Sequence, residues 1–294
     1  MPMKKILVTG ANGFIGKIVT EKLIGSHSVD VYCRKVKKSD PSFIVDKQLD
    51  LNILVSPHKD TIYDYVINCI ACSNTSCGNW NTLYEANCKT TMALIENTHF
   101  KNFIQFSSFS IFSKNSIKSG SADPNNLYGL SKLVSEKLLK MHANPENKFI
   151  VLRMPIVIGK FKKQGDIVSY LYNSLIDNKT VKLFNDGKYH RNIIHVNEVA
   201  ESVNVLVTRS KWTEEYCEIN LNSSNTMSVL EICLYMKDKL NSDSKIEFIN
   251  KPGANDFDSL VMSNSHIIDG YDFKSCIESL DCFLQEMKHD PMNN

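Results

Sequence analysis

Thr9-Gly10-Ala11-Asn12-Gly13-Phe14-Ile15-Gly16 is the stretch that decides the fold of this 294-residue chain. It follows an apolar run, Lys5–Val8, that is typical of a buried strand, and it opens a helical pattern over Phe14–Ile24. In such a strand–turn–helix unit, Gly10 permits a tight turn, Gly13 lets a pyrophosphate approach backbone N–H groups, and Gly16 lets the helix pack close to the sheet. The helix N-terminus adds a partial positive charge. The stretch therefore predicts a dinucleotide-binding site, with an ordinary glycine turn as the alternative.

Short apolar runs alternate with longer helical patterns through the first half of the chain, which is typical of a parallel sheet. We expect strands at Lys5–Val8, Val29–Arg34, Phe43–Val45, Tyr65–Ile70, Asn102–Ser107 and Lys148–Arg153. Right-handed crossovers would place the intervening helices on both faces of the sheet. The expected helices are Phe14–Ile24, Trp80–Thr98 and Asn126–His142. The predicted fold class is α/β, with a doubly wound parallel sheet of the Rossmann type.

The pattern changes after Arg153, where a smaller α/β lobe is expected on the C-terminal side. Its predicted elements are a helix over Ile167–Asp177, a strand at Val181–Phe184, a turn at Asn185–Gly187, an extended segment at Arg191–Val196, and helices over Asn197–Thr208, Ser228–Leu240 and Lys274–Lys288. Ser228 and Glu231 have the spacing of a capping box. We predict a dinucleotide-binding domain over residues 1–155, to which residues 190–220 return. Residues 156–189 and 221–294 would form a substrate-binding lobe, with a cleft between the two.

Composition and charge exclude several classes of protein. Apolar residues make up 43% of the chain, and 34 basic against 32 acidic residues leave a net charge of +2, so we expect neither nucleic acid nor membrane as a partner. No apolar run reaches the length of a membrane span, and the first run is too short for a signal-peptide core. The nine cysteines are scattered, which favours a reduced, cytoplasmic protein. Cys69-Ile70-Ala71-Cys72 has redox-pair spacing but ends a strand, so we interpret it as packing and expect no metal site.

The end of the second predicted strand selects the cofactor. A carboxylate there would bind the ribose hydroxyls of NAD. This chain instead has Arg34, followed by Lys35, Lys37 and Lys38. A guanidinium can hold a 2′-phosphate through two parallel hydrogen bonds, so we predict NADP. NAD is the alternative if the basic loop is only solvated beside a cofactor held through its pyrophosphate.

A second motif, Tyr128-Gly129-Leu130-Ser131-Lys132, places a phenol and an amine one turn apart on a helix face. A free tyrosine has a pKa of about 10, and a nearby ammonium would lower that pKa toward the working range of an acid–base group. Ser108 follows the strand Asn102–Ser107 and can hydrogen-bond a substrate carbonyl, with Ser107 and Ser110 as close competitors. Because Tyr-x-x-x-Lys alone is common on helix surfaces, the prediction depends on its combination with the glycine motif.

Together these residues resemble the extended short-chain dehydrogenase/reductase superfamily, in its nucleotide-sugar epimerase, dehydratase and reductase branch. The resemblance covers most of the chain and implies that Ser108, Tyr128 and Lys132 are catalytic. Ser108 is identified by counting back from Ile111-Phe112, where the family usually has Val-Tyr. The cofactor-binding residues that the resemblance implies are Gly10, Asn12, Gly13, Phe14, Ile15, Gly16, Arg34, Asp50, Leu51, Cys69, Ile70, Ala71, Asn87, Tyr128, Lys132 and Met154.

The resemblance also implies substrate contacts. His190–Ala200 is similar to the segment whose arginine binds the substrate's diphosphate, so Arg191 would be that ligand, with a surface ion pair as the alternative. Lys251, in Lys251-Pro252-Gly253, resembles a later phosphate-binding position, and Ser108 and Ser110 complete the substrate set. One departure matters for the reaction: Ile156 stands where many epimerases have an asparagine at the diphosphate.

The reaction that the resemblance implies is reversible hydride transfer at a sugar carbonyl. Arg34 and Ile156 favour an NADP-dependent reductase of a nucleotide-linked 4-keto-6-deoxy sugar, with polysaccharide biosynthesis as a setting. A nucleotide-sugar 4-epimerase with tightly bound NAD is the first alternative. A small aldehyde or ketone reductase and a non-catalytic cofactor-binding sensor are the others. By analogy we expect a homodimer in which the helices over 80–98 and 126–142 pair.

Overall fold

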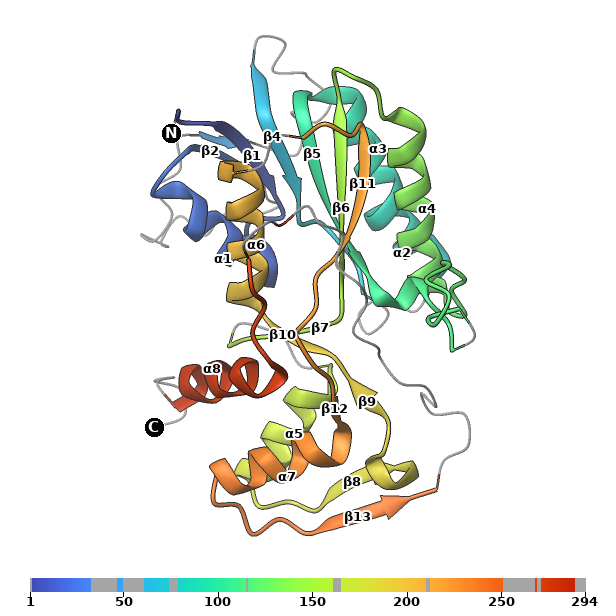
Figure 1. Cartoon of the computed structure of the whole chain (residues 1–294), viewed down its shortest axis with the longest axis vertical. Coiled ribbons are helices and arrows are strands. Elements are labelled where there is room, and N and C mark those ends of the chain that lie inside the picture. The colour runs from blue at the N-terminus through green and yellow to red at the C-terminus, as the bar shows by residue number, and fades with distance from the viewer. Residues whose placement is uncertain are drawn as a thin grey trace.

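Seven parallel strands form the central sheet of the computed structural model (Figure 1). The structure describes residues 2–32, 47–49, 61–73, 79–114, 116–160, 165–209, 212–250, 268 and 271–288. The strand order is β11-β6-β5-β4-β1-β2-β3. The bounds are β1 Lys5–Thr9, β2 Ser28–Tyr32, β3 Lys47–Leu49, β4 Ile62–Asn68, β5 His99–Ser108, β6 Lys148–Met154 and β11 Tyr216–Asn220. These strands are nearly continuous apolar runs because helices cover both faces of the sheet.

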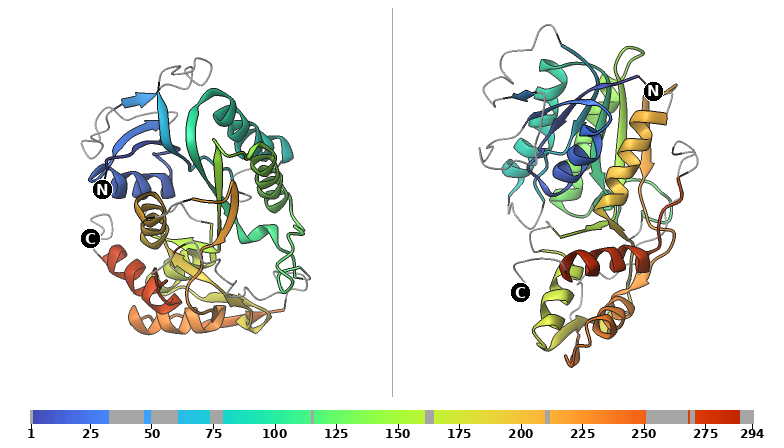
Figure 2. Two further views of the ribbon diagram at one scale, coloured as in Figure 1. Left: turned by 45° about the horizontal axis from the view of Figure 1, so that its top comes forward. Right: turned by 90° about the vertical axis from the view of Figure 1, so that its left-hand side faces the viewer.

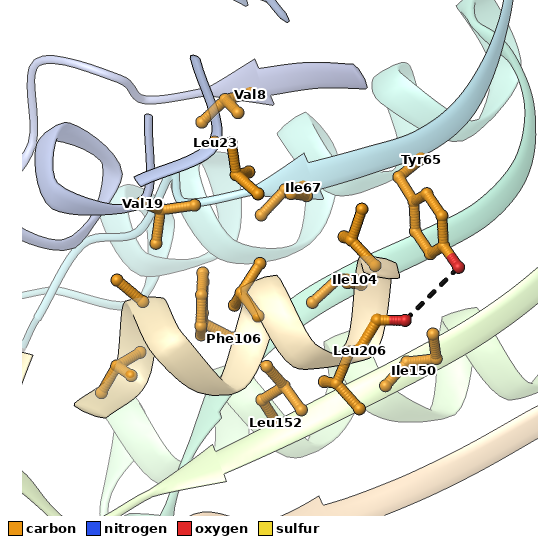
Figure 3. Close-up of a cluster of buried hydrophobic side chains, with 14 of the residues drawn as sticks. Val8, Val19, Leu23, Tyr65, Ile67, Ile104, Phe106, Ile150, Leu152 and Leu206 are labelled. Atoms are coloured by element: carbon orange, nitrogen blue, oxygen red, sulfur yellow. Dashed lines mark hydrogen bonds between the residues drawn. The ribbon is translucent and has the colours of Figure 1, made fainter. Parts of the chain in front are cut away.

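One face of the sheet is covered by α1 (Phe14–Ile24) and α6 (Val196–Arg209), which pack side by side (Figures 1 and 2). Alternate strand residues such as Ile67 and Ile104 point into this layer and meet Val19 of α1 and Leu206 of α6. Figure 3 shows the same layer, where the Tyr65 hydroxyl also donates to the Leu206 carbonyl at 3.5 Å. This buried layer holds α1 against the sheet.

The other face carries α2 (Trp80–Tyr84), a π-helical turn at Glu85–Lys89, α3 (Thr90–Asn97) and α4 (Leu127–His142) (Figure 1). Leu94 of α3 and Leu139 of α4 are buried against Phe103 and Phe149 of the strands. The two faces therefore have separate apolar layers, built from alternating residues of the same strands.

The remaining elements lie below the carboxyl ends of the strands in Figure 1. They are β7 Ile156–Ile158 paired with β10 Ile193–His195, β8 Val181–Phe184 paired with β13 Ile246–Ile249, β9 His190–Arg191 paired with β12 Met227–Ser228, a 3-10 turn at Asn185–Gly187, and the helices α5 Ile167–Ile176, α7 Val229–Lys239 and α8 Cys276–Lys288. They share a core in which Leu171, Leu183, Ile232 and Phe283 are buried. The Ser228–Glu231 capping box opens α7 as predicted.

The predicted fold class is confirmed, and α1 has its predicted bounds. Three predicted elements need correction. The helix expected over Trp80–Thr98 is interrupted by the π-helical turn. The strand expected to reach Ile70 ends at Asn68, whose side chain accepts a hydrogen bond from the Ile70 N–H and turns the chain. The segment expected over Arg191–Val196 is divided at Asn192, whose side chain bonds Ser223 and Asn225 instead.

Other predictions concern residues that the structure does not describe, and the structure also contains strands that were not predicted. The predicted strand at Phe43–Val45 and the end of the second strand at Arg34 lie outside the described residues, and β11 and β13 were not predicted. Cys69 is a free thiol, so Cys69 and Cys72 do not form a redox pair with each other. Cys72 is disulfide-bonded, so the expectation of a fully reduced chain is wrong at that position. In the ranges that the structure describes, no helix is long and apolar enough to cross a membrane.

Candidate active site

The glycine turn lies at the carboxyl end of β1, between β1 and β4, where the strand order reverses. Gly10 has a φ of +69°, and a Cβ atom there would lie 2.9 Å from the carbonyl carbon of Cys69. A Cβ on Gly16 would lie 2.2 Å from the Gly10 carbonyl oxygen. Both positions therefore exclude a side chain, and the first turn of α1 packs directly on the strand end, as the motif predicts.

The N-terminus of α1 is open to a ligand. Gly13 is its N-cap in an extended conformation, and among the described residues no side chain caps it and no acidic residue lies in its first turn. Asn12 and Gly13 are exposed, whereas Phe14 and Ile15 are half-buried. Because the first N–H groups of a helix have no partner within the helix, this end offers donors and a positive dipole to an anion. The residues present fit a dinucleotide pyrophosphate.

Buried amides fix the segment that follows β4. The Asn68 Oδ1 atom accepts hydrogen bonds from the Thr9 hydroxyl at 2.7 Å and from the Ile70 N–H at 3.1 Å. The Asn87 side chain accepts from the Cys72 N–H at 2.9 Å and donates to the Cys72 carbonyl at 3.0 Å. These bonds set the course of residues 69–72 beside the glycine turn.

Asn87 also donates to the Ser131 hydroxyl at 2.9 Å, and so joins this segment to α4. Its side chain is fully buried and bonds protein groups, and the cofactor contact that the resemblance implies for Asn87 stays a prediction. The π-helical turn that carries Asn87 was not visible in the sequence, because one extra residue in a turn leaves the apolar pattern nearly unchanged.

Three serines at the end of β5 have different partners, which separates them. The Ser107 hydroxyl donates to the Glu136 carboxylate at 2.5 Å. The Ser108 Oγ atom caps the short turn Phe109–Ile111 by accepting from the Ser110 N–H at 3.1 Å, and it lies close enough to the Tyr128 phenol to lower the pKa of that phenol. The Ser110 hydroxyl accepts from Ser108 at 3.2 Å. Ser108 is therefore the serine that lies beside the predicted acid–base group.

Tyr128 lies in the first turn of α4. The Asn126 side chain caps this helix by accepting from the Gly129 N–H at 2.8 Å, which fixes where it begins. Tyr128 is half-buried, and burial raises the pKa of its phenol, while the neighbouring Ser108 side chain acts in the opposite direction. The net direction is upward, so the phenol carries its proton at neutral pH.

Lys132 is buried, and its Nζ atom donates to the Phe106 carbonyl at 2.9 Å. Burial lowers the pKa of Lys132 to about 8, although the neighbouring Cys88, Glu136 and Cys69 side chains act in the opposite direction. The sequence predicted that this ammonium lowers the pKa of Tyr128. In this structure burial is the largest effect on the phenol and the ammonium donates to a backbone carbonyl, so the lowering of the Tyr128 pKa by Lys132 stays a prediction.

A buried ion-pair network that the sequence did not predict lies directly beneath these residues. Arg153 donates to Glu136 from Nε at 3.1 Å and from a terminal nitrogen at 2.6 Å, and it also pairs with Glu218 at 2.7 Å. The Phe112 ring covers the guanidinium at 5.6 Å, so the residue that replaces the family's usual tyrosine packs against Arg153. Glu136 stands four residues after Lys132, a spacing that in sequence suggests only a surface pair.

The other predicted site residues are dispersed. Met154 ends β6 and is the register partner of Ser108, so it lies beside the predicted catalytic group. Arg191 lies in β9, below the sheet in Figure 1, and its guanidinium donates to the His190 carbonyl at 2.8 Å. Ile156 is half-buried at the start of β7, where its N–H donates to the Asn192 carbonyl at 3.3 Å. The predicted residues Arg34, Asp50, Leu51 and Lys251 lie outside the described residues.

The site combines an open glycine turn at the point of strand reversal, a serine at the end of β5, and a tyrosine and a lysine on α4. This combination defines a dinucleotide-dependent enzyme of the oxidoreductase type. The model of the NAD dependent epimerase/dehydratase family matches residues 6–221, so the chain belongs to that family. The resemblance to the extended short-chain dehydrogenase/reductase superfamily is thereby confirmed.

Known relatives are distant in sequence and close in fold. Protein CapI of Staphylococcus aureus is 22% identical, with 85% of this chain and 87% of that protein covered. The UDP-N-acetylglucosamine 4-epimerase of Methanobrevibacter ruminantium, solved with UDP-N-acetylmuramic acid, has a TM-score of 0.80 at 20% identity and covers 98% of this chain and 99% of its own. The UDP-glucuronic acid 4-epimerase of Bacillus cereus, solved with its nucleotide sugar and NAD, also has a TM-score of 0.80 at 20% identity, with 97% and 99% covered.

Proposed function

We propose that the chain catalyses reversible hydride transfer at carbon 4 of a nucleotide-linked sugar, with Tyr128 as the proton donor and acceptor. The observation that carries the proposal is the position of Ser108 beside the Tyr128 phenol, close enough to lower the pKa of that phenol, at the strand edge next to the open glycine turn. Two groups that can share one carbonyl oxygen are thus paired beside the place for a dinucleotide.

The cofactor would be held by Gly10, Gly13 and Gly16, with its pyrophosphate on the α1 N-terminus and the segment 69–72 alongside. When bound, it supplies or accepts the hydride. The described residues support a dinucleotide of either kind, and NADP in particular rests on Arg34 in the sequence.

The proton is handled by side chains of this chain. Because burial keeps the Tyr128 phenol protonated, it can donate to a carbonyl oxygen as negative charge develops there. The Ser108 hydroxyl, which lies beside the phenol, would orient that oxygen and stabilise it. Lys132 would hold the nicotinamide ribose, and its pKa of about 8 leaves it largely protonated at neutral pH.

The substrate would be a nucleoside-diphosphate sugar, as in the relatives whose complexes contain UDP-sugars. We propose that residues 156–189 and 221–294 form its binding lobe and that Arg191 and Lys251 hold the diphosphate. Holding the diphosphate far from the reacting carbon supplies positioning energy. A homodimer through α2, α3 and α4 is proposed by analogy, and exposed Tyr84, Leu127 and Leu130 on these helices support it.

Two functions that use the same hydride-transfer chemistry, a reductase and a 4-epimerase, are each supported by different observations. Arg34 and Ile156 favour an NADP-dependent reductase of a 4-keto-6-deoxy sugar, which exchanges its cofactor in each turnover. The epimerase relatives, one of them solved with NAD, favour a 4-epimerase, which keeps its cofactor through both half-reactions. The epimerase fits the comparisons equally well, so both remain candidates.

One experiment separates the two functions. The purified protein is denatured and the released cofactor is identified by mass spectrometry, and the native protein is then incubated with UDP-glucose, UDP-glucuronic acid, UDP-N-acetylglucosamine and a 4-keto-6-deoxy nucleotide sugar. Consumption of added NADPH only with the keto sugar supports the reductase. Bound NAD and interconversion of a UDP-sugar without added cofactor support the epimerase. No turnover of any of these compounds would contradict both.

A further inference from the structure

Helix α4 and strand β5 are joined by a regular series of contacts. Three residues spaced four apart on α4 share one helix face, and each faces a different one of three consecutive residues at the end of β5. Lys132 Nζ donates to the Phe106 carbonyl at 2.9 Å, the Glu136 carboxylate accepts from the Ser107 hydroxyl at 2.5 Å, and Ser108 lies close enough to the Tyr128 phenol to lower the pKa of that phenol. Glu136 is the member of this series to which the proposed reaction assigns no part.

Glu136 is anchored from two strands at once. Its side chain is almost fully buried, its Oε1 atom accepts from Ser107 of β5, and both of its oxygens accept from Arg153 of β6. Ser107 and Arg153 are register partners in the sheet. The carboxylate therefore fixes α4 against two adjacent strand ends at the level of Ser108.

A buried ion pair contributes little net stability, because desolvation offsets most of its attraction. Arg153 also has a second carboxylate, since Glu218 on β11 lies 2.7 Å from it and is a third exposed. Neutralising Arg153 therefore does not require Glu136. The burial of this carboxylate needs another reason, and its contacts point toward α4 and the end of β5.

The reason that we infer for burying the Glu136 carboxylate is its effect on the Lys132 ammonium. The groups that act on its charge are Cys69 after β4, Cys88 in the π-helical turn, and Glu136 on its own helix. Burial raises the pKa of the Cys88 thiol to about 11 and raises that of Cys69 as well, so both thiols are neutral near pH 7. Among the groups identified around Lys132, Glu136 is the carboxylate, and it is bound to the Arg153 guanidinium.

We propose that Glu136 is a positioning residue, which holds the end of β5 and the Lys132 ammonium in register with Tyr128 through its bonds to Ser107 and Arg153. The inference rests on the proposed function of Tyr128 and Lys132 as reacting groups. It adds that the helix motif extends one further turn, to a carboxylate that touches neither substrate nor cofactor.

The direct test is a titration of Lys132 that needs no substrate. Protein carrying ¹³C at the lysine ε position is titrated by NMR, and the Lys132 signal is assigned from its loss in Lys132→Arg. In Glu136→Gln the midpoint should fall from about 8 by roughly one pH unit. The matched control is Glu218→Gln, which removes the other carboxylate from Arg153 and should leave the midpoint unchanged. Equal midpoints in Glu136→Gln and wild type would overturn the electrostatic part of the inference.

The positioning part is tested by kinetics on the nucleotide sugars of the panel above. Glu136→Gln should lower kcat by about tenfold or more with little change in KM, because alignment and not binding is lost. Ser107→Ala keeps the Glu136–Arg153 ion pair intact, so it should lower kcat without moving the titration midpoint of Lys132. It is the variant to use if Glu136→Gln does not fold. An unchanged kcat in Ser107→Ala would overturn this part. If wild type turns over no compound of the panel, the proposed function fails, while the titration still decides the inference.

Discussion

The Cα atom of Gly129 lies so close to Ser110 that a Cβ atom added to it would be 1.9 Å from the Ser110 carbonyl oxygen. The second contact of such an atom is also with the Ser110 backbone, at 2.7 Å, so no flexible side chain can give way. This close approach sets the distance between α4 and the turn that follows β5. It brings the first turn of α4, which carries Tyr128, against the turn that begins after Ser108.

Gly129→Ala should therefore lower activity by roughly 100-fold, because a displacement of about 1 Å at reacting groups costs that much. It should also destabilise the fold by about 1–3 kcal/mol through overpacking. Helix propensity alone predicts the opposite sign, since alanine stabilises a helix by about 1 kcal/mol relative to glycine. Urea unfolding and kcat measurements distinguish the two, and a more stable, fully active variant would contradict this account of the contact.

Lys132→Met should lose activity and gain stability. A pKa lowered from 10.5 to about 8 means that burying the charged amine costs roughly 3 kcal/mol at neutral pH. The lost hydrogen bond to Phe106 offsets about 1 kcal/mol of the gain, and the Phe106 carbonyl retains a bond from the Gln105 side chain. We expect a net gain of about 1–2 kcal/mol in urea unfolding at pH 7, and a loss of stability would contradict it.

The same lysine predicts a pH dependence of stability. Below about pH 8 the amine is protonated in both the folded and the unfolded state, so the cost is fully present. Between about 8 and 10.5 the unfolded state binds more protons, so the free energy of unfolding rises with pH. The difference between wild type and Lys132→Met should therefore shrink as the pH is raised from 7.5 to 9.5. A constant difference would mean that the amine titrates normally.

Gly16→Ala should abolish cofactor binding, because its Cβ would lie 2.2 Å from the Gly10 carbonyl and push α1 away from the glycine turn. Gly25→Ala is the matched control at the other end of the same helix, where a Cβ meets no described atom within 4 Å. NADH and NADPH fluorescence titrations check both. Equal affinities in the two variants would show that the turn is not the cofactor site.

Arg191→Ala tests the proposed diphosphate contact. KM for a nucleotide sugar should rise by about tenfold or more with a smaller change in kcat, since a charge-assisted hydrogen bond contributes roughly 1.5–3 kcal/mol. Lys188→Ala removes an exposed cation nearby, which pairs with Asp186, and should have no such effect. An unaffected KM in Arg191→Ala would favour a reductase of small aldehydes or ketones, which has no diphosphate to bind.

The sequence predicts the sheet and the glycine turn because both depend on local patterns. α1 begins after Gly13 and ends at Ile24 because the apolar spacing and the flanking glycines fix both ends. By contrast β11 and β13 were missed, since Tyr216–Asn220 and Ile246–Ile249 are short and obtain their order from pairing with β6 and β8. Such pairings join residues far apart in the chain and leave no periodic signal.

The sequence predicted the site residues that belong to a motif. It did not predict the residues whose roles depend on tertiary contacts. Local reasoning does not separate Ser107, Ser108 and Ser110. The resemblance singles out Ser108, and the positions of Glu136 and Tyr128 show what distinguishes Ser107 from Ser108. Glu136 itself was missed because a carboxylate four residues after a lysine suggests a solvated pair, whereas the approach of β6 buries it against Arg153.

The most direct test of the account is the turnover of Tyr128→Phe on the nucleotide sugar that wild type converts. The substitution removes one oxygen and keeps the ring that packs beside Ser108. We predict that kcat falls at least 100-fold while the affinity for cofactor stays within about twofold, because general acid–base catalysis contributes 10²–10⁴-fold. A Tyr128→Phe variant with wild-type kcat would contradict the assignment of the phenol and, with it, the proposed reaction.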